Sequence, residues 1–125
     1  MKKQRPVYLN LTQIQLPAAG LSSILHRISG IIMFVAIGIL IWLLDLSLRS
    51  HASFDMVVSM LKHDLFKFIL WGILTAFIYH LVAGIRHMIM DAGYWEELSS
   101  GTLSAQVTIG ISVVFSIMVG VWLWV

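Results

Sequence analysis

The sequence predicts an all-α integral membrane protein with three transmembrane helices. Hydrophobic residues make up 59% of its 125 residues and charged residues 11%, whereas soluble domains average about 45–50% and about 25%. Three apolar stretches reach the roughly 20 residues that a helix needs to cross a bilayer. No ten-residue alternation typical of membrane strands occurs, so helices must satisfy the backbone in lipid. At this length we expect one domain.

Composition excludes several classes of function. The chain has no cysteine, which rules out disulfides, iron–sulfur clusters and thiolate metal sites within it. Its formal net charge of +2 gives no support to nucleic-acid binding. The basic start is followed by polar residues and Pro17 rather than the apolar core of a signal peptide, so we expect insertion through the spans themselves. Residues 1–20 are predicted to be irregular or interfacial, because Pro6 and Pro17 interrupt regular helix.

The predicted spans cover residues 22–47, 65–90 and 105–125. Between the first two, residues 49–64 are polar and of mixed charge, which indicates a loop with a short amphipathic turn around residues 54–61. Residues 91–104 form a second predicted loop. The third span has no ionisable residue and carries small residues that permit close helix packing, namely Gly110, Ser112, Ser116 and Gly120.

Basic residues near the first span favour a cytoplasmic N-terminus; they are Lys2, Lys3, Arg5 and Arg27. Arg49 and Lys62 in the following loop weaken that bias. With three spans, the second loop is then cytoplasmic and the C-terminus lies on the outer side. The start of the first span and the end of the second therefore share one side of the membrane.

His80 is the most informative residue of the second span. Ionisable groups are expensive at membrane depth, so such a residue is a functional hypothesis by default. A neutral imidazole can bind haem iron, and Gly84, one turn away, would leave room for a flat macrocycle. The alternative is a polar contact between helices, in which His80 bonds a neighbouring hydroxyl or backbone group. Spacing alone leaves both interpretations open.

If His80 binds haem, the second axial ligand must come from another chain. His87 shares the face of His80, but it lies about 10 Å along the helix, too far to reach the same iron. His26 is expected near the membrane boundary, and the third span has no histidine. His87 and Arg86 are expected near the interface, where they either bond local groups or snorkel, or donate to haem propionates.

Polar residues at the same membrane side could serve a quinone. Ser23 and Arg27 are four residues apart on one helix face. Together they could donate hydrogen bonds to a quinone carbonyl and stabilise negative charge. The alternative is that Arg27 anchors the helix and Ser23 caps or packs. Asp91, with Glu96 and Glu97, could deliver protons to a reduced quinone or simply form a solvated loop.

The residues discussed above belong to two long motifs. After Arg5-Pro6, the first motif is Ser23-Ile-Leu-His26-Arg27-Ile-Ser29. The second is His80-x3-Gly84-Ile-Arg86-His87-x3-Asp91-x-Gly93. Together they resemble the cytochrome b subunit of succinate dehydrogenase, one of the two small membrane anchors of respiratory complex II, in its proteobacterial form. The resemblance covers nearly the whole chain, including three spans and the loop lengths.

The resemblance implies particular roles for these residues. His80 matches the axial ligand of a haem b, and a second anchor subunit provides the other ligand. Ser23, Ile24 and Arg27 match the ubiquinone site, and His26 and Arg27 match groups near the haem propionates. The family also implies iron–sulfur and flavoprotein subunits as partners, at the cytoplasmic face of the bacterial inner membrane, with the C-terminus in the periplasm.

Three other interpretations remain open. One is the anchor of a quinol:fumarate reductase, which runs in the opposite direction. Another is a structural anchor without haem. A third, a small transporter or channel component, would need ionisable residues along several spans, but here they gather at one membrane side. Succinate oxidation itself is expected on another subunit, since the chain carries no flavin, dicarboxylate or cluster motif.

Overall fold

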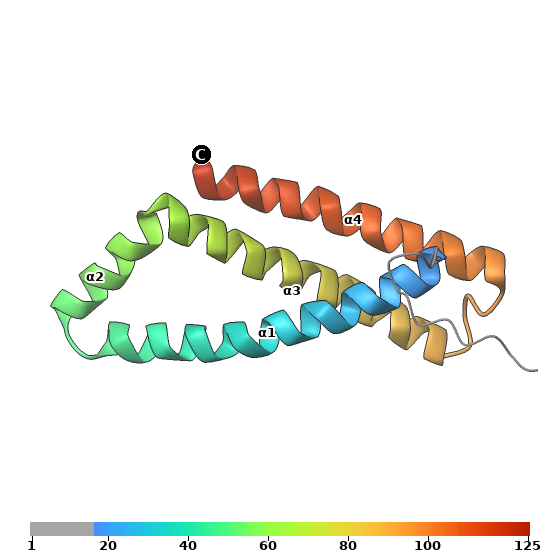
Figure 1. Cartoon of the computed structure of the whole chain (residues 1–125), viewed down its shortest axis with the longest axis horizontal. Helices are drawn as coiled ribbons and strands as arrows, with labels where there is room; N and C mark the ends of the chain where they lie inside the picture. The colour runs from blue at the N-terminus through green and yellow to red at the C-terminus, as the bar shows by residue number, and fades with distance from the viewer. Residues whose placement is uncertain (1–16) are drawn as a thin grey trace, which may run out of the picture.

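The computed structural model describes residues 17–125, which form four helices and no strand. They are α1 (Ala18–Leu48), α2 (His51–Lys62), α3 (Asp64–Asp91) and α4 (Leu98–Trp124). In Figure 1, α1 and α3 lie together at one end and diverge toward the other, where α2 bridges them, while α4 runs beside α3. The all-α prediction is confirmed. Most of the predicted irregular segment lies outside the described residues, and α1 begins at Ala18, within its last residues.

Three of the helices are long and apolar enough to cross a membrane. Helices α1, α3 and α4 contain 31, 28 and 27 residues, with mean hydropathies of 2.6, 2.0 and 2.1 in their most apolar segments. At 1.5 Å per residue, each exceeds the roughly 30 Å of a hydrocarbon core. The three-span prediction is confirmed, and the chain is a multi-pass membrane protein.

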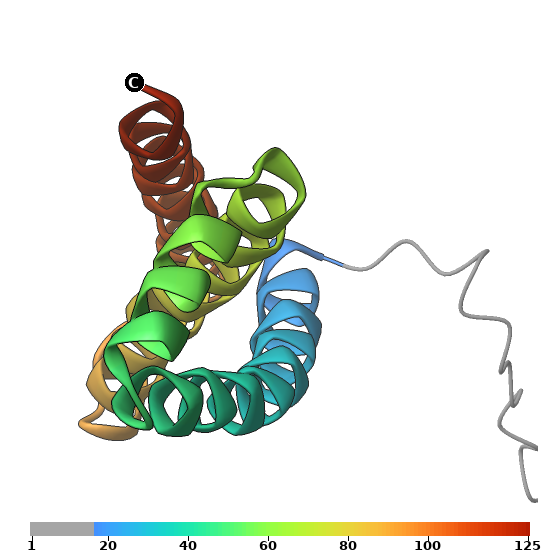
Figure 2. The ribbon, with the colours of Figure 1, turned by 90° about the vertical axis from the view of Figure 1, so that its left-hand side faces the viewer.

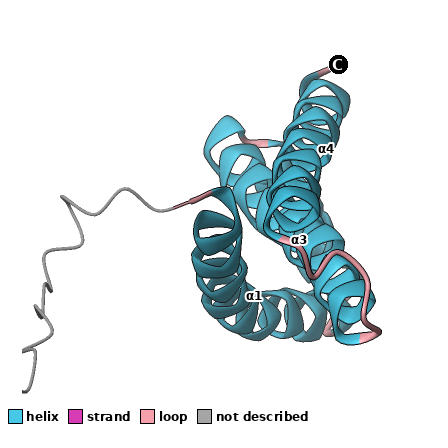
Figure 3. Ribbon diagram, turned by 90° about the vertical axis from the view of Figure 1, so that its right-hand side faces the viewer, coloured by secondary structure: helices cyan, strands magenta, loops and turns pink. Residues whose placement is uncertain are grey.

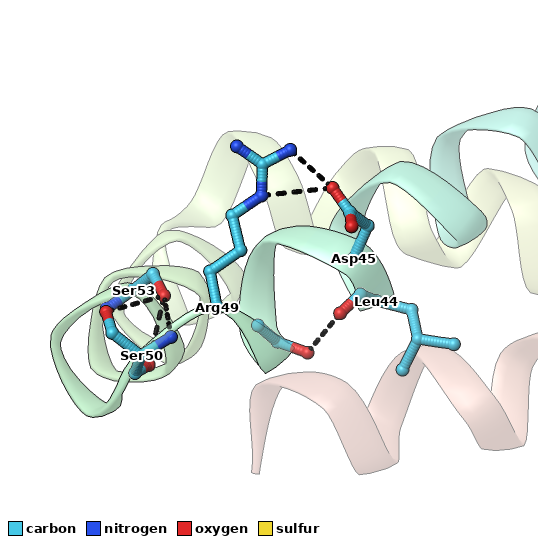
Figure 4. Close-up of polar contacts among 6 residues, drawn as sticks. Leu44, Asp45, Arg49, Ser50 and Ser53 are labelled. Atoms are coloured by element: carbon cyan, nitrogen blue, oxygen red, sulfur yellow. Dashed lines mark hydrogen bonds and ion pairs between the residues drawn. The ribbon is translucent and has the colours of Figure 1, made fainter.

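The predicted loop between the first two spans is instead the twelve-residue helix α2. Ser50 and Ser53 form a capping box, in which the Ser53 amide donates to Ser50 Oγ (3.1 Å) and the Ser50 amide to Ser53 Oγ (2.9 Å). Arg49 pairs with Asp45 one turn back in α1, as Figure 4 shows. These local contacts end one helix and start the next, so a polar composition alone wrongly indicated a loop.

Helix α4 begins at Leu98, seven residues before the predicted third span. The small polar residues at its start are typical of a loop, but Gly101 and Ser104 are buried. A Cβ at Gly101 would lie 3.2 Å from the Trp95 carbonyl oxygen, so the connecting loop lies close against this turn. The loop itself is only residues 92–97, with Gly93 at φ 94° and Trp95 at φ 59°. Packing thus overrides the local pattern.

The buried side chains of α1 and α4 are small, and many are polar. In α1 they recur every seven residues, and in α4 mostly every four, at Ser22, Ser29, Ala36, Ser104, Thr108, Ser112 and Ser116. Large apolar side chains point outward instead; Phe34 is 81% exposed and Trp122 73%. Membrane helices pack through small residues because lipid solvates large apolar ones equally well.

Helices α3 and α4 meet closely around Trp71. Its Nε1 donates to the Ser116 carbonyl oxygen (2.9 Å), and Thr75 Oγ1 lies 2.7 Å from Ser116 Oγ. A Cβ at Gly120 would come within 3.1 Å of Trp71 Nε1. The predicted packing role is therefore confirmed for Ser112, Ser116 and Gly120, which face other helices. It is wrong for Gly110, where a Cβ would meet nothing within 4 Å.

One end of the bundle gathers the start of α1, the end of α3 and the start of α4. Figure 3 views the molecule from this end, and Figure 2 views it from the opposite end, where α2 lies in front. The expectation that the start of the first span and the end of the second share one side is confirmed. The clustered histidines of α1 and α3 and the predicted quinone residues lie in the parts of these helices that meet near this end.

Candidate functional site

Three histidines meet between α1 and α3. The rings of His26 and His80 stack, with centroids 4.1 Å apart and planes 13° from parallel. The ring of His87 lies 5.1 Å from that of His26, tilted by 57°. All three side chains are half-buried. His26 therefore lies directly beside His80, a contact that the sequence did not predict.

The hydrogen bonds of His80 define which of its nitrogens carries the proton. His80 Nδ1 lies 3.0 Å from Ser29 Oγ and 3.2 Å from the backbone carbonyl oxygen of His26. A carbonyl oxygen only accepts, so Nδ1 must be the protonated nitrogen of a neutral ring. The Nε2 atom then keeps its lone pair. This is the tautomer of a histidine that ligates a metal through Nε2.

Two glycines make room for the stacked rings. A Cβ at Gly30 would lie 3.2 Å from His80 Cε1, and a Cβ at Gly84 would lie 3.6 Å from His26 Nε2. The space beside Gly84, predicted to admit a flat macrocycle, is therefore next to the His26 ring. Gly30, which no sequence pattern singled out, is the glycine that admits His80.

One buried atom of this cluster lacks a partner. Nε2 of His26 is fully buried and makes no hydrogen bond with any other described residue. Leaving a buried polar atom unpaired costs about 1–3 kcal/mol. Such atoms are rare in folded proteins and call for a specific explanation. A group from outside the chain that bonds this nitrogen would remove the cost.

Tyr79 makes a second link between α3 and α1. Its hydroxyl donates to the Ser22 carbonyl oxygen (2.7 Å) and lies 3.0 Å from Ser22 Oγ. Both residues are buried. This pair was not predicted from the sequence, although Ser22 and Ser29 are seven residues apart and thus share a helix face. That spacing is the one signal that could have revealed the contact.

Arg86 does not snorkel outward, which was one of the expectations for it; it is buried against α4. It is only 3% exposed, and it donates from Nε to Ser104 Oγ (2.9 Å) and from an Nη atom to the Gly101 carbonyl oxygen (3.1 Å). Adjacent residues point about 100° apart on a helix, so Arg86 faces α4 while His87 faces α1. Arg86 therefore joins α3 to α4 and is not part of the histidine cluster.

The predicted quinone residues lie near the same end of the bundle. Ser23 and Ile24 are half-buried, whereas Arg27 and Asp91 are exposed. None of the three polar side chains hydrogen-bonds another described residue, and the one ion pair within residues 17–125 is Arg49–Asp45. Within residues 17–125, no side chain or backbone group pairs with their polar atoms. Their roles remain predictions.

No group of three or more metal-ligating side chains in residues 17–125 is arranged to hold a metal ion. The His26 and His80 rings face each other in parallel, so their nitrogens do not converge on one point. A single imidazole can ligate a metal ion whose other coordination positions are mostly filled by a cofactor or by another chain. The cluster can thus offer one nitrogen ligand to such a group.

The fold and the site define a class of protein, a helical multi-pass membrane protein with a cluster of three histidines between two of its spans. Residues 1–119 match the family model described as succinate dehydrogenase/fumarate reductase transmembrane subunit. The chain belongs to this family.

Similar proteins carry consistent names. The chain is 38% identical to the succinate dehydrogenase cytochrome b556 subunit of Coxiella burnetii, over 99% of this chain and 100% of that protein. It is 34% identical to the protein of the same name from Paracoccus denitrificans, over 91% and 88%. It is 28% identical to the succinate dehydrogenase cytochrome b560 subunit of Reclinomonas americana, over 94% and 85%. These matches support a membrane-anchor cytochrome b subunit of succinate dehydrogenase.

Proposed function

We propose that this chain holds one axial ligand of a b-type haem and part of a ubiquinone-reduction site in succinate:ubiquinone oxidoreductase. The observation that carries the proposal is the hydrogen bonding of His80, which leaves Nε2 free to ligate. The relatives are named as b-type cytochromes, and a bound haem would supply one-electron chemistry at its iron.

The arrangement of the histidines fits a haem shared between two chains. A haem brings its own equatorial nitrogens, so it needs protein ligands only along one axis. Two axial ligands approach the iron from opposite sides, whereas the His26 and His80 rings stack in parallel. His26 therefore does not oppose His80, and we assign the opposite ligand to a second anchor subunit.

The neighbouring polar groups fit the carboxylate edge of a haem. The unpaired Nε2 of His26 has no partner among the described residues, and a propionate oxygen would bond it once the contacts that cover the atom open. His87 lies against the His26 ring, and the exposed guanidinium of Arg27 follows His26 in the chain. We assign His26, Arg27 and His87 to the propionate side of the haem.

The quinone site in this proposal comprises Ser23, Ile24 and Arg27. The hydroxyl of Ser23 and the guanidinium of Arg27 would donate to a quinone carbonyl, where negative charge develops during reduction. Ile24 adds an apolar contact. Asp91, exposed at the end of α3, would deliver protons to the reduced quinone.

Partners complete the complex at this end of the bundle. The iron–sulfur and flavoprotein subunits would dock on the cytoplasmic side of the bacterial inner membrane, where the basic N-terminal region and the 92–97 loop are placed by the positive-inside rule. The C-terminus would face the periplasm. The names of the relatives favour succinate dehydrogenase over a fumarate reductase.

The reduced-minus-oxidised spectrum of the purified complex tests the haem assignment. We expect a b-type band in the wild-type complex and its loss in His80→Ala, because the iron loses an axial nitrogen. The matched control is His51→Ala, an exposed histidine at the start of α2 that should leave the band unchanged. A wild-type complex without haem would favour the purely structural anchor, and an unchanged band in His80→Ala would place the ligand elsewhere.

Activity with two electron acceptors tests the quinone assignment. Arg27→Leu should lower succinate:quinone activity by at least about tenfold, since one charge-stabilising donor is removed. Succinate oxidation by an artificial acceptor that does not use this site should stay intact. Arg49→Leu, another exposed arginine of the same chain, is the control. Normal quinone activity in Arg27→Leu would remove Arg27 from the site.

A further inference from the structure

We propose that Ser29 is the positioning residue of the haem ligand: its hydroxyl oxygen accepts the Nδ1 proton of His80 and so sets the electron donation and orientation of the ligating ring. This inference rests on the proposed function, since it concerns how His80 would be held while it ligates. The residues that surround the ring on α1, namely His26, Ser29 and Gly30, are called the His80 cradle below.

The Ser29 hydroxyl can act toward His80 only as a hydrogen-bond acceptor. Its own hydrogen is donated to the His26 carbonyl oxygen at 2.7 Å. Its oxygen therefore faces the His80 Nδ1 hydrogen at 3.0 Å as an acceptor. Ser29 is buried, with 4% of its surface exposed. Water is thus kept from competing for the same hydrogen.

The rest of the His80 cradle restricts rotation of the ring. The His26 ring covers one face of the His80 ring at 4.1 Å. The absent side chain of Gly30 leaves just enough room for Cε1, because a Cβ there would lie 3.2 Å away. The His26 carbonyl oxygen is a second acceptor for Nδ1 at 3.2 Å. Contacts from a short stretch of α1 therefore fix the plane of a side chain from α3.

A hydrogen-bond acceptor on Nδ1 makes Nε2 a stronger electron donor, as is general for metal-bound histidines. Stronger donation favours the oxidised iron and lowers the reduction potential. Loss of the Ser29 hydroxyl should therefore raise the potential of the haem and weaken its retention. The weakening is expected to be roughly tenfold, at the low end for such partners, because the His26 carbonyl remains.

The test is a redox titration of the haem in the assembled complex, together with electron paramagnetic resonance of the oxidised form. We expect Ser29→Ala to shift the midpoint potential upward and to change the g-values. Ser29→Thr keeps a hydroxyl, so its midpoint potential and g-values should stay close to those of the wild type. Ser29→Val has the shape of the threonine variant without its hydroxyl, so its values should resemble those of Ser29→Ala. Ser47→Ala is the matched control, since Ser47 also bonds a carbonyl three residues back in α1 but has no partner on another helix.

Wild-type potential and g-values in Ser29→Ala would overturn the proposal. A Ser29→Thr complex as altered as Ser29→Val would also overturn it, because shape rather than the hydroxyl would then be responsible. Loss of haem in the Ala and Val variants with retention in Thr would support it. A wild-type complex without haem b would instead defeat the proposed function, so the two failures are distinguishable.

Gly30→Ala gives an independent check on the His80 cradle. The new methyl group would press on His80 Cε1 and turn the ring, while the Ser29 hydroxyl stays in place. We expect altered g-values with the haem still bound. Gly38→Ala, at a position on α1 where a Cβ meets nothing within 4 Å, is the control. Identical g-values in Gly30→Ala and Gly38→Ala would show that the ring is not confined by α1.

Discussion

At the scale of single residues, polar contacts in this bundle orient side chains more than they stabilise the fold. Hydrogen bonds between membrane helices contribute about 0.6 kcal/mol on average. Two such bonds on His80 Nδ1 would therefore contribute only about 1 kcal/mol. Their larger effect is to fix one tautomer and one ring plane, which a metal ligand requires.

Tyr79→Phe should lower the stability of the protein, and it removes no contact of the three clustered histidines. The Tyr79 hydroxyl is buried and bonded to Ser22, so its removal leaves the Ser22 hydroxyl without that partner. We expect a loss of about 1–2 kcal/mol in the free energy of unfolding. Reversible denaturation in mixed detergent micelles measures it.

The control for Tyr79→Phe is Tyr94→Phe, which changes the same group at a position 65% exposed. It should leave the free energy of unfolding unchanged. Equal stability of the two variants would show that the Tyr79–Ser22 contact contributes nothing measurable.

The sequence singled out His80 as a candidate site residue, but it did not predict which residues contact its ring. The depth of His80 and its apolar surroundings marked it, because a histidine there is costly. The contacts of Ser29 and Gly30 with His80 were not predicted, because they depend on how α1 is rotated against α3, which no local pattern encodes. The contacts of Arg86 were not predicted for the same reason, since its partners Gly101 and Ser104 lie on another helix.

At the scale of helices, small residues determine where the spans can touch. In α4, a row of small residues from Ser104 to Ser116 faces the bundle, while its large apolar residues are exposed. Close approach lets Trp71 of α3 reach the Ser116 carbonyl. Packing of this kind is the main source of association between helices in lipid.

Two glycines of α4 should respond differently to the same substitution. Gly120→Ala should lower the free energy of unfolding by about 1 kcal/mol, because Trp71 must shift and its bond to Ser116 weakens. Gly110→Ala should leave it unchanged or raise it, since alanine favours helix and meets no neighbour. Detergent denaturation of both variants compares them, and a Gly120→Ala protein as stable as Gly110→Ala would contradict this account of the interface.

The three spans were predictable because about twenty consecutive apolar residues have few other uses. The helix boundaries were harder to predict from the sequence. Helix α2 is stabilised by the Ser50–Ser53 capping box at its start, in a stretch whose polar residues are typical of loops. The early start of α4 depends on burial of Gly101 and Ser104. Both elements are set by contacts more specific than hydropathy.

At the scale of the whole molecule, the proposed function assigns to this chain only part of a site. The clustered histidines His26, His80 and His87, together with Ser23, Arg27 and Asp91, belong to the first part of α1 or the last part of α3. These two parts meet at one end of the bundle (Figure 1). His80 can supply one ligand, and no second histidine of the cluster opposes it. The central claim is therefore that His80 Nε2 ligates a haem whose other ligand belongs to a second anchor subunit.

The most direct test is the reduced-minus-oxidised spectrum of the assembled complex carrying His80→Gly, recorded without and with added imidazole. The glycine leaves a space that free imidazole can fill as a replacement ligand. We expect the b-type band to be lost or shifted in the variant and restored when imidazole is added. A wild-type band in His80→Gly without imidazole would contradict the assignment of His80 as the ligand.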